Sequence, residues 1–227
     1  MPMANLKDTH TVQHILTSDG SSTLYAPAFN EHYHSIHGAI QESMHVFIRA
    51  GLDQFPAPDC HLAIWEMGFG TGLNALLTYI HAAGRSIHYT GIEAYPLDAA
   101  MLASLNYAQA LEGSEAVYCQ LCEAPWDLPL ALSAHFTLLK RHIDLADYEP
   151  EQPFDLIYYD AFAPNAQPEL WSDAVMERLY QWLRPGGVFV TYSAKSSVRR
   201  ALLQAGFAVE KLPGPPGKRE MLRARKG

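Results

Sequence analysis

The sequence predicts an α/β protein with a mostly parallel sheet and helices on both faces of that sheet. Two observations support this prediction. Short apolar runs alternate with segments of helical periodicity from residue 62 to residue 206, which is typical of strand–helix–strand units with right-handed crossovers. A glycine-rich turn, GFGTG, also lies between the first of these strands and the first of these helices, where α/β proteins bind nucleotides.

Two elements precede this alternation. Residues 11–34 contain TVQHILT and TLYAP on either side of the turn composition SDGSS, and they predict a hairpin or a short irregular segment. Residues 35–52 have helical periodicity, and PAPD follows them as a helix breaker. We expect residues 1–52 to form an N-terminal extension on the substrate side. Residues 53–227 are expected to form the main domain as one folding unit.

The elements of the main domain follow in order. The strands expected from apolar runs cover residues 62–68, 86–94, 136–144, 154–162 and 187–194. The helices expected between them cover residues 72–84, 96–111, 168–184 and 196–206. Pro96 begins its helix at a position where the missing N–H costs nothing. FAVEKL and REMLRARK are expected to pair as final strands around PGPPG, and the stretch 112–135 reads as an insertion.

The net charge of −8 is unevenly distributed. From Lys195 to the C-terminus the chain holds nine basic and two acidic residues, a local charge of +7. The rest of the chain holds seven basic and 22 acidic residues, a charge of −15. A basic end on an acidic body can bind phosphates despite the negative total. A solvated terminal strand and helix would give the same pattern, and charge alone does not separate the two interpretations.

Composition excludes several classes of protein. The chain is 48% hydrophobic and 18% charged, which is typical of globular rather than disordered proteins. No apolar run approaches the roughly 20 residues that span a bilayer, and the N-terminus lacks the apolar core of a signal peptide. We therefore expect a cytoplasmic protein without membrane contact. No nucleophile-elbow spacing supports hydrolysis.

Cysteine and histidine residues give only weak metal signals. Cys119 and Cys122 form a single C-x-x-C with no second pair, which favours ordinary reduced thiols. His34 and His37 are expected to share a helical face, but no acidic or cysteine partner stands at ligand spacing. The sequence therefore predicts no metal site.

The glycine turn matches neither of the common phosphate-binding patterns. It reads G-x-G-x-G at Gly68, Gly70 and Gly72, whereas the dinucleotide pattern requires a glycine where Leu73 stands. The phosphate loop requires a lysine that is absent. A turn of this kind suits a nucleotide without a pyrophosphate, and S-adenosyl-L-methionine is such a ligand. Its methionine part must pass close to the backbone, so side chains have to be absent there.

Carboxylates follow at the ends of the next two strands. Glu93 stands 21 residues after Gly72, where a carboxylate can accept both ribose hydroxyls of a nucleoside. Asp144 ends the following strand, where it can accept from an adenine amino group. Taken singly, each is explained as well by a charge at a helix N-terminus or by a turn residue. Their order after a glycine turn favours a nucleoside site.

A third carboxylate, Asp160, follows the apolar run LIYY and enters the loop DAFAPNAQPELW. At a strand end it faces the ligand crevice of a parallel sheet. There it could position an amine for in-line methyl transfer and stabilise its charge, or it could cap the following turn. Phe162 and Pro164 could stack on a flat substrate or pack the loop.

Several motifs together resemble one family. GFGTGLNALL, GIEAYPL, DAFAPNAQPELW, RPGGVFVTYSA, VRRALLQAGF and GPPGKREMLRA look like the methyltransferase domain of the bacterial enzyme that completes 5-methylaminomethyl-2-thiouridine at the tRNA wobble position. The resemblance runs from SDGSSTLY to the last residues. In two-domain members of the family this domain is fused to a flavin-dependent oxidase. That oxidase domain is absent from this chain, which therefore resembles the stand-alone form.

The resemblance implies a class I methyltransferase (Rossmann-like) fold with S-adenosyl-L-methionine as donor. It also implies the anticodon region of tRNA as partner and an aminomethyl group on a modified uridine as acceptor. Asp160 falls on the aspartate near the transferred methyl. The expected donor-binding residues are Glu66, Gly68, Gly70, Thr71, Gly72, Asn74, Glu93 and Asp144. The expected substrate-binding residues are Phe162, Pro164, Lys195, Arg199, Arg200, Lys218 and Arg219.

The chain departs from the family pattern at two places, and two alternatives stay open. Gln167-Pro168 replaces the usual Asn-Pro, and AKSS replaces a glycine-containing form before VRR; both changes could alter how the tRNA loop is held. One alternative is a methyl- or aminopropyltransferase for a small amine, since aminopropyltransferases place an aspartate at the same strand end. The other is a non-catalytic, tRNA-associated nucleoside-binding subunit. Asp160 and the intact glycine turn argue against lost catalysis, and the basic tail argues for a polyanionic acceptor.

Overall fold

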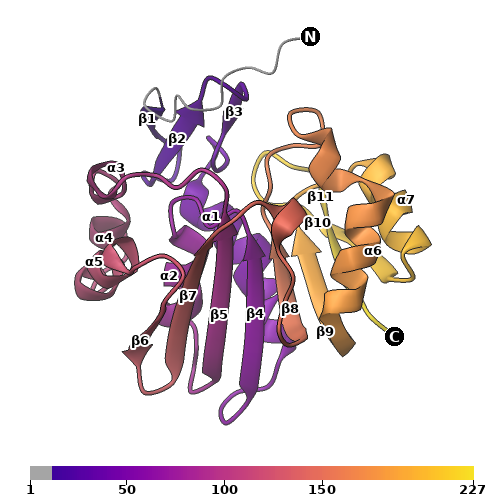
Figure 1. The fold of residues 1–227 in the computed structure, drawn as a ribbon. Coiled ribbons are helices and arrows are strands. Elements are labelled where there is room, and N and C mark those ends of the chain that lie inside the picture. The colour runs from indigo at the N-terminus through magenta and orange to yellow at the C-terminus, as the bar shows by residue number, and fades with distance from the viewer. Residues whose placement is uncertain (1–11) are drawn as a thin grey trace.

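The computed structural model describes residues 12–227. Its centre is an eight-stranded sheet (Figure 1). The strands of this sheet are β4 (His61–Met67), β5 (Ser86–Glu93), β6 (Pro129–Ser133), β7 (Phe136–His142), β8 (Phe154–Tyr159), β9 (Leu183–Thr191), β10 (Ala208–Pro213) and β11 (Glu220–Arg225). Their order is β10-β11-β9-β8-β4-β5-β7-β6. The inner strands from β7 to β9 are parallel, and β6, β10 and β11 are antiparallel to their neighbours.

Helices cover both faces of the sheet. The helices are α1 (Ala39–Ser43), the π-helix η2 (Met44–Arg49), α2 (Leu73–Ile80), α3 (Ala99–Ala103), α4 (Tyr107–Ala110), α5 (Glu115–Glu123), α6 (Asp173–Trp182) and α7 (Ser196–Gln204). Short 3-10 turns cover η3 (Leu52–Gln54), η4 (Leu145–Asp147) and η5 (Pro168–Trp171).

Neighbouring residues of one strand pack into different cores, because successive side chains of a strand point to opposite faces. Ile64 belongs to the buried cluster that contains residues of α1, η2, α2 and α5, whereas Trp65 belongs to the cluster that contains residues of α6 and α7. The same alternation recurs in β8, where Ile157 and Tyr158 belong to opposite cores, and in β9, where Val188 and Phe189 do. The predicted α/β fold with helices on both faces is confirmed.

A second, three-stranded sheet of order β1-β2-β3 lies at the upper end of the large sheet in Figure 1. It consists of β1 (Gln13–Leu16), β2 (Ser22–Ala26) and β3 (Glu31–His32). The Asn106 side chain fixes it to the main domain, because it accepts from Ser22 N–H at 2.7 Å and donates to the Gly20 carbonyl at 2.8 Å. The predicted hairpin is confirmed. Residues 1–11 of the expected extension lie outside the described part of the chain.

The division between an extension and a main domain at residue 52 stays a prediction. Val46, Phe47 and Ile48 of η2 belong to the same buried cluster as Tyr158 and Val190 of the central sheet. The end of the predicted extension therefore packs into the core of the main domain.

Two predicted helices have different bounds in the structure. The helix expected over residues 35–52 begins at Ala39, because residues 33–38 form turns, and it continues as a π-helix and a 3-10 turn. Its first N–H groups bond to side chains that lie far away in the sequence. Gln41 N–H donates to Asp19 at 3.0 Å, and Ala39 N–H donates to Ser21 Oγ at 3.2 Å. The helix expected over residues 96–111 is broken into α3 and α4 at Asn106, the residue that holds β2.

Three further boundaries differ. The stretch 112–135 is more than an insertion, since it contributes α5 and the edge strand β6, which pairs with β7. The helix expected from residue 168 begins at Asp173, where the Ser172 hydroxyl accepts from Val175 N–H at 3.4 Å and caps it. Strand β9 begins at Leu183, so the RPGG segment lies inside a strand rather than ending a helix. The two final strands pair as predicted.

Among residues 12–227 we find no helix with the length and apolarity needed to cross a bilayer.

Candidate functional site

The candidate site lies where the strand order of the large sheet reverses. The chain runs from β4 to β5 and β7 on one side, and then returns to β8 on the other side of β4. In parallel sheets the ligand crevice forms outside the carboxyl ends of the strands at this point. A cavity of about 250 Å³ lies here, and its wall includes Gly68 and Gly70 after β4, Glu93 at the end of β5, Asp144 after β7 and Asp160 after β8. We call it the donor cavity.

The three glycines of the turn after β4 all have positive φ angles. The angles are +81° at Gly68, +49° at Gly70 and +75° at Gly72, a region that other residues enter only at a cost. A Cβ on Gly68 would lie 3.1 Å from the carbonyl oxygen of Asp160, and a Cβ on Gly70 would lie 3.2 Å from the Tyr33 ring. Glycine is therefore required both by the backbone conformation and by two close neighbours.

Glu93 braces the glycine turn and also faces the donor cavity. Its Oε2 accepts from Gly70 N–H at 3.0 Å and its Oε1 accepts from Tyr95 N–H at 3.0 Å. Burial raises the pKa of this carboxyl, against the effect of the backbone donors. Each carboxylate oxygen keeps a further lone pair, so the side chain can accept two more hydrogen bonds.

Asp144 stands two residues beyond the end of β7, and it is exposed in the cavity wall. Its Oδ1 accepts from Ala146 N–H at 2.8 Å and begins η4. Asp144 thus forms a turn and lines the cavity at the same time, and its contact with an adenine amino group stays a prediction.

Asn74 connects two carboxylates beneath the glycine turn. Its Nδ2 donates to Glu66 Oε1 and to Asp160 Oδ2, at 2.9 Å each. Glu66 is 1% exposed and burial raises its pKa well above the ordinary value. It does not line the donor cavity, and neither does Gly72, whereas Thr71 and Asn74 do. Glu66 therefore supports the Asn74 side chain from outside the cavity wall instead of facing a ligand.

Asp160 titrates far from the ordinary range of an aspartate. Burial, followed by the like charge of Glu42, raises the pKa of its carboxyl to about 7, against the hydrogen bond from Asn74. Its backbone N–H donates to the Met67 carbonyl at 3.2 Å, which ties the end of β8 to the end of β4.

A second cavity, of about 350 Å³, adjoins the first. Asp160 and Phe162 line both cavities, as do Tyr33 and His34. The rest of the second wall includes Glu42 and other side chains from residues 31–42, Tyr192 after β9, and Lys218 in the turn between β10 and β11. We call it the acceptor cavity.

Aromatic rings form part of the boundary between the two cavities. The Phe162 ring packs on Phe29 at 4.8 Å between centroids and on Tyr33 at 5.3 Å. Burial raises the pKa of the Tyr33 hydroxyl, so Tyr33 stays neutral at physiological pH. Phe162 thus faces the site, whereas Pro164 lines neither cavity.

Comparison with known proteins agrees with this geometry. Residues 128–227 match the family described as S-adenosyl-L-methionine-dependent methyltransferase. The chain is 35% identical, over 93% of its length, to the tRNA 5-methylaminomethyl-2-thiouridine biosynthesis bifunctional protein MnmC of Cupriavidus metallidurans. It is 34% identical, over 91% of its length, to the protein of the same name from Cupriavidus necator. It spans about a third of the length of these relatives, 33% of each.

A solved structure supports the same relation. MNMC2 from Aquifex aeolicus superposes with a TM-score of 0.78 and 26% identity, over 95% of this chain and 70% of the other. The chain is therefore similar to S-adenosyl-L-methionine-dependent methyltransferases both in sequence and in fold. DesVI of Streptomyces venezuelae, with a TM-score of 0.50 and 11% identity over 83% of this chain and 92% of the other, shares the fold alone. The class I methyltransferase fold expected from the sequence is confirmed.

The basic residues that the sequence predicts for substrate binding fall into two groups. Lys195 Nζ donates to Asn165 Oδ1 at 2.6 Å, so it joins the start of α7 to the loop after Asp160. Lys218 lies in the acceptor cavity wall and pairs with Glu42. Arg199, Arg200 and Arg219 are exposed, and none of the three forms an ion pair within residues 12–227.

The expected pairing of His34 and His37 on a helix is wrong, because both stand in the turns before α1. His34 is buried, and burial lowers the pKa of its imidazole to about 4. No group of three or more metal-ligating side chains occurs in the part of the chain that the structure describes.

The sequence reasoning missed Glu42 and Tyr192. Glu42 was available as an acidic residue within the apolar helix pattern AIQESMHVFI, a residue type that is almost never fully buried unless it is paired. Tyr192 had no local signal, because only the fold brings it into the wall of the cavity that Asp160 also lines.

Proposed function

We propose that this methyltransferase transfers a methyl group from S-adenosyl-L-methionine to the amine of 5-aminomethyl-(2-thio)uridine at the tRNA wobble position. The product is 5-methylaminomethyl-(2-thio)uridine. The observation that carries the proposal is the position of Asp160, whose side chain lines both the donor cavity and the acceptor cavity. The relatives that cover most of the chain are named for the biosynthesis of this nucleoside, which supports the choice of acceptor.

On the donor side, the roles expected from the sequence fit the cavity wall. Glu93 would accept both ribose hydroxyls, and Asp144 would accept from the adenine amino group. Gly68 and Gly70 would leave room for the methionine part of the donor. The donor supplies an electrophilic methyl group on a positively charged sulfur.

On the acceptor side, the cavity has aromatic rings that can stack on a base. Tyr33, Phe162 and Tyr192 line it, and RNA-binding proteins hold unstacked anticodon-loop bases on such rings. An anticodon base would enter between these side chains, with its aminomethyl group directed at Asp160. The tRNA backbone would bind Arg199, Arg200 and Arg219.

The proposed reaction needs a proton acceptor. A primary alkyl amine is protonated near neutral pH, as lysine is with a pKa of about 10.4, and the ammonium ion has no lone pair. With a pKa of about 7, the Asp160 carboxylate is a stronger base than an ordinary aspartate. Asp160 takes one proton from the ammonium. The freed nitrogen lone pair could then accept the methyl group that the donor would supply, with the S–CH₃ electron pair left on sulfur, and Asp160 would later release its proton to water. A cytoplasmic location, where tRNA is available, belongs to the same proposal.

The test is incubation with S-adenosyl-L-methionine and tRNA from a strain that lacks this methylation, followed by nucleoside analysis. We expect 5-methylaminomethyl-(2-thio)uridine to form. Asp160→Asn and Asp160→Ala should lower the single-turnover rate at least about tenfold, with donor affinity far less affected, since the interaction acts mainly in the transition state. Methylation of a free polyamine but not of the tRNA would reject the proposed acceptor in favour of a small amine. Donor binding without any methylation would favour the non-catalytic alternative.

A further inference from the structure

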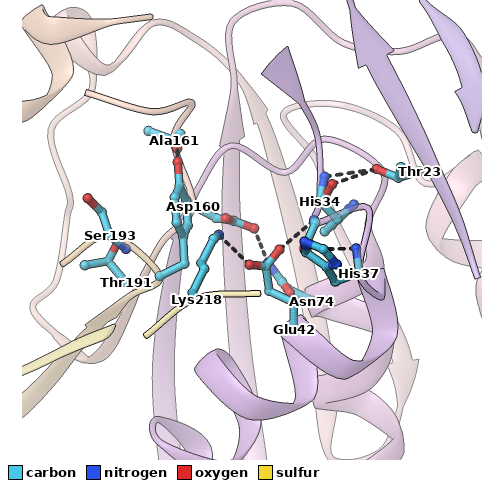
Figure 2. A network of polar contacts seen from close by, with 12 residues as sticks. Thr23, His34, His37, Glu42, Asn74, Asp160, Ala161, Thr191, Ser193 and Lys218 are labelled. Atoms are coloured by element: carbon cyan, nitrogen blue, oxygen red, sulfur yellow. Dashed lines mark hydrogen bonds and ion pairs between the residues drawn. The ribbon is translucent and has the colours of Figure 1, made fainter. Parts of the chain in front are cut away.

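Glu42 is a buried carboxylate that the roles proposed so far leave without a function. It is 5% exposed and lines the acceptor cavity together with Asp160. Its Oε1 accepts from Lys218 Nζ at 2.5 Å, and its Oε2 accepts from Ser35 N–H at 2.7 Å. Figure 2 shows Glu42, Lys218 and Asp160 close together, with the contact from Lys218 to Glu42 drawn as a dashed line.

Lys218 is held on its other side by an aromatic ring. Its Nζ lies 3.8 Å from the centroid of the Tyr192 ring, and the Tyr192 hydroxyl donates to the Ala161 carbonyl at 2.8 Å. The Glu42–Lys218 pair is therefore connected to the residue that directly follows Asp160.

Only one member of this ion pair is buried: the Glu42 side chain is 6% exposed, and the Lys218 side chain is 33% exposed. Desolvation of the Glu42 carboxylate offsets part of the attraction between the two charges, and apolar residues of similar volume often stabilise a fold as well as a desolvated ion pair. This pair joins α1 to the turn between β10 and β11, a contact that apolar side chains could also make. Its place beside Asp160 indicates a role in the chemistry of the cavity.

The charges around the acceptor cavity favour a cation. Asp160, Glu42 and Glu31 carry three negative charges when ionised, and Lys218 carries one positive charge. An acceptor that enters as an ammonium ion would neutralise part of the remaining negative charge. Glu42 also disfavours the ionised form of Asp160, whereas Lys218 favours it.

We propose that Glu42 and Lys218 are positioning residues of the acceptor site: Glu42 attracts the acceptor as its ammonium ion, and the pair sets how firmly Asp160 holds the proton taken from that ion. The inference rests on the proposed function for the identity of the amine. The coupling among the three side chains does not depend on that identity.

Other titratable groups also face Asp160. Tyr33, His34, Glu93 and Tyr192 line the cavities around it, and Glu66 reaches it through Asn74. The wall of the acceptor cavity further contains Glu31, His32 and His37. A His32→Gln and His37→Gln double variant is the control for the contribution of these two side chains.

The test compares the wild type with Glu42→Gln and Lys218→Met, and it uses two measurements. The first is the titration of the Asp160 carboxyl, followed by NMR in protein with isotope-labelled aspartate and assigned with Asp160→Asn. The second is the pH dependence of the single-turnover methylation rate on aminomethyl-uridine tRNA. Thermal unfolding shows that each variant is folded.

We expect the two variants to move the Asp160 midpoint in opposite directions. Glu42→Gln removes a negative charge and leaves Lys218 positive, so the midpoint falls by about half a unit or more. Lys218→Met leaves Glu42 uncompensated, so the midpoint rises by a similar amount. The rate profile should follow the same shifts, KM for the tRNA should rise several-fold in Glu42→Gln, and the double histidine variant should keep the wild-type midpoint.

The outcomes separate this inference from the proposed function. Opposite NMR shifts without methylation of the tRNA by the wild type would support the coupling and reject the proposed acceptor. Midpoints that stay in place, or that move in one direction in both folded variants, would overturn the inference even if the tRNA is methylated. A midpoint that depends on the two histidines would assign the coupling to them instead.

Discussion

At the scale of single residues, Asp160 and Glu93 show how burial changes what a carboxylate can do. Both stand at strand ends that face the donor cavity, and burial raises the pKa of both. Glu93 receives two backbone N–H groups and so braces the turn beside it. Asp160 receives only the Asn74 amide from the described residues. The first is suited to fixed binding and the second to exchange of a proton.

The raised pKa of Asp160 predicts a pH-dependent cost in stability. Its folded pKa of about 7 lies above the ordinary value of 3.8, so between these values the folded state binds more protons than the unfolded state. The stability that the protonated Asp160 carboxyl contributes to the folded state at low pH is therefore lost as pH rises through about 7. Asp160→Asn cannot ionise and still accepts from Asn74. We expect it to exceed the wild type in free energy of unfolding by on the order of 2 kcal/mol at pH 8, and the gain should vanish near pH 4.

Denaturant titrations of both proteins across this range give the measurement. A difference that stays constant with pH would mean that Asp160 is ionised in the folded state throughout.

For Glu93, the prediction concerns the affinity for the donor. Loss of a charge-assisted hydrogen bond costs roughly 1.5–3 kcal/mol, or about ten- to a hundredfold in affinity. Calorimetry on Glu93→Ala should show this loss for S-adenosyl-L-methionine. Ala leaves both Gly70 N–H and Tyr95 N–H without their acceptor, whereas Gln keeps an acceptor for one of the two, so Glu93→Gln is the milder variant. It should lose less affinity than Ala, and unchanged binding in folded Glu93→Ala would remove this residue from the site.

At the scale of elements, the turn between β4 and α2 is held from several directions. Its glycines have positive φ angles, Glu93 of β5 bonds to it, and Asn74 of α2 links it to Asp160 after β8. The turn, the strand ends and the first turn of α2 therefore form one rigid unit. Such rigidity suits a reaction in which alignment supplies much of the rate.

The rigidity of this turn can be tested at Gly68. In Gly68→Ala the new Cβ would stand 3.1 Å from the Asp160 carbonyl oxygen at a φ of +81°. Gly113→Ala is the matched control, because its φ is +77° and nothing lies within 4 Å. Both variants should lose about 1–2 kcal/mol of stability from backbone strain. Gly68→Ala should also slow methyl transfer, since Asp160 must shift.

Denaturant titration and single-turnover rates on the two variants separate strain from displacement. Equal rates in both would show that the close contact with Asp160 is not needed for alignment.

At the scale of the whole molecule, the basic residues are concentrated in the C-terminal segment of an otherwise acidic chain. The fold places part of this segment at the edge of the sheet where the two cavities lie. Helix α7 begins directly after β9, at the same edge of the sheet as the two cavities. Arg199 and Arg200 are exposed on this helix, and Arg219 is exposed in the turn that carries Lys218. Other basic side chains at this end are paired, as Arg223 is with Glu210 and Lys211 with Glu220. Of the basic side chains in this C-terminal segment, Arg199, Arg200 and Arg219 thus stay exposed, whereas others are held in ion pairs.

Those cations predict the salt dependence of tRNA binding. Each phosphate contact releases counterions, so the logarithm of affinity falls with the logarithm of salt concentration. The Arg199→Gln and Arg200→Gln double variant should flatten this slope by about one unit per lost contact. Lys211→Gln is the matched control, because its charge is already paired at 2.8 Å, and it should change the slope little. Filter binding or fluorescence titration at several salt concentrations measures this. Equal slopes in all three proteins would leave the arginines as a solvated surface.

The sequence by itself determined the order of the elements and the positions at strand ends. Alternating apolar runs, the glycine turn, Glu93, Asp144 and Asp160 are local features, because strand periodicity and positive φ angles depend on adjacent residues. Only the tertiary structure decided that Glu42, Tyr192 and Lys218, which lie far apart in the chain, line one cavity together with Asp160. It also placed Glu66 beneath the cavity instead of in its wall, and it raised the pKa of Asp160. Burial and charge pairing depend on what the fold brings into contact, so no local pattern contains them.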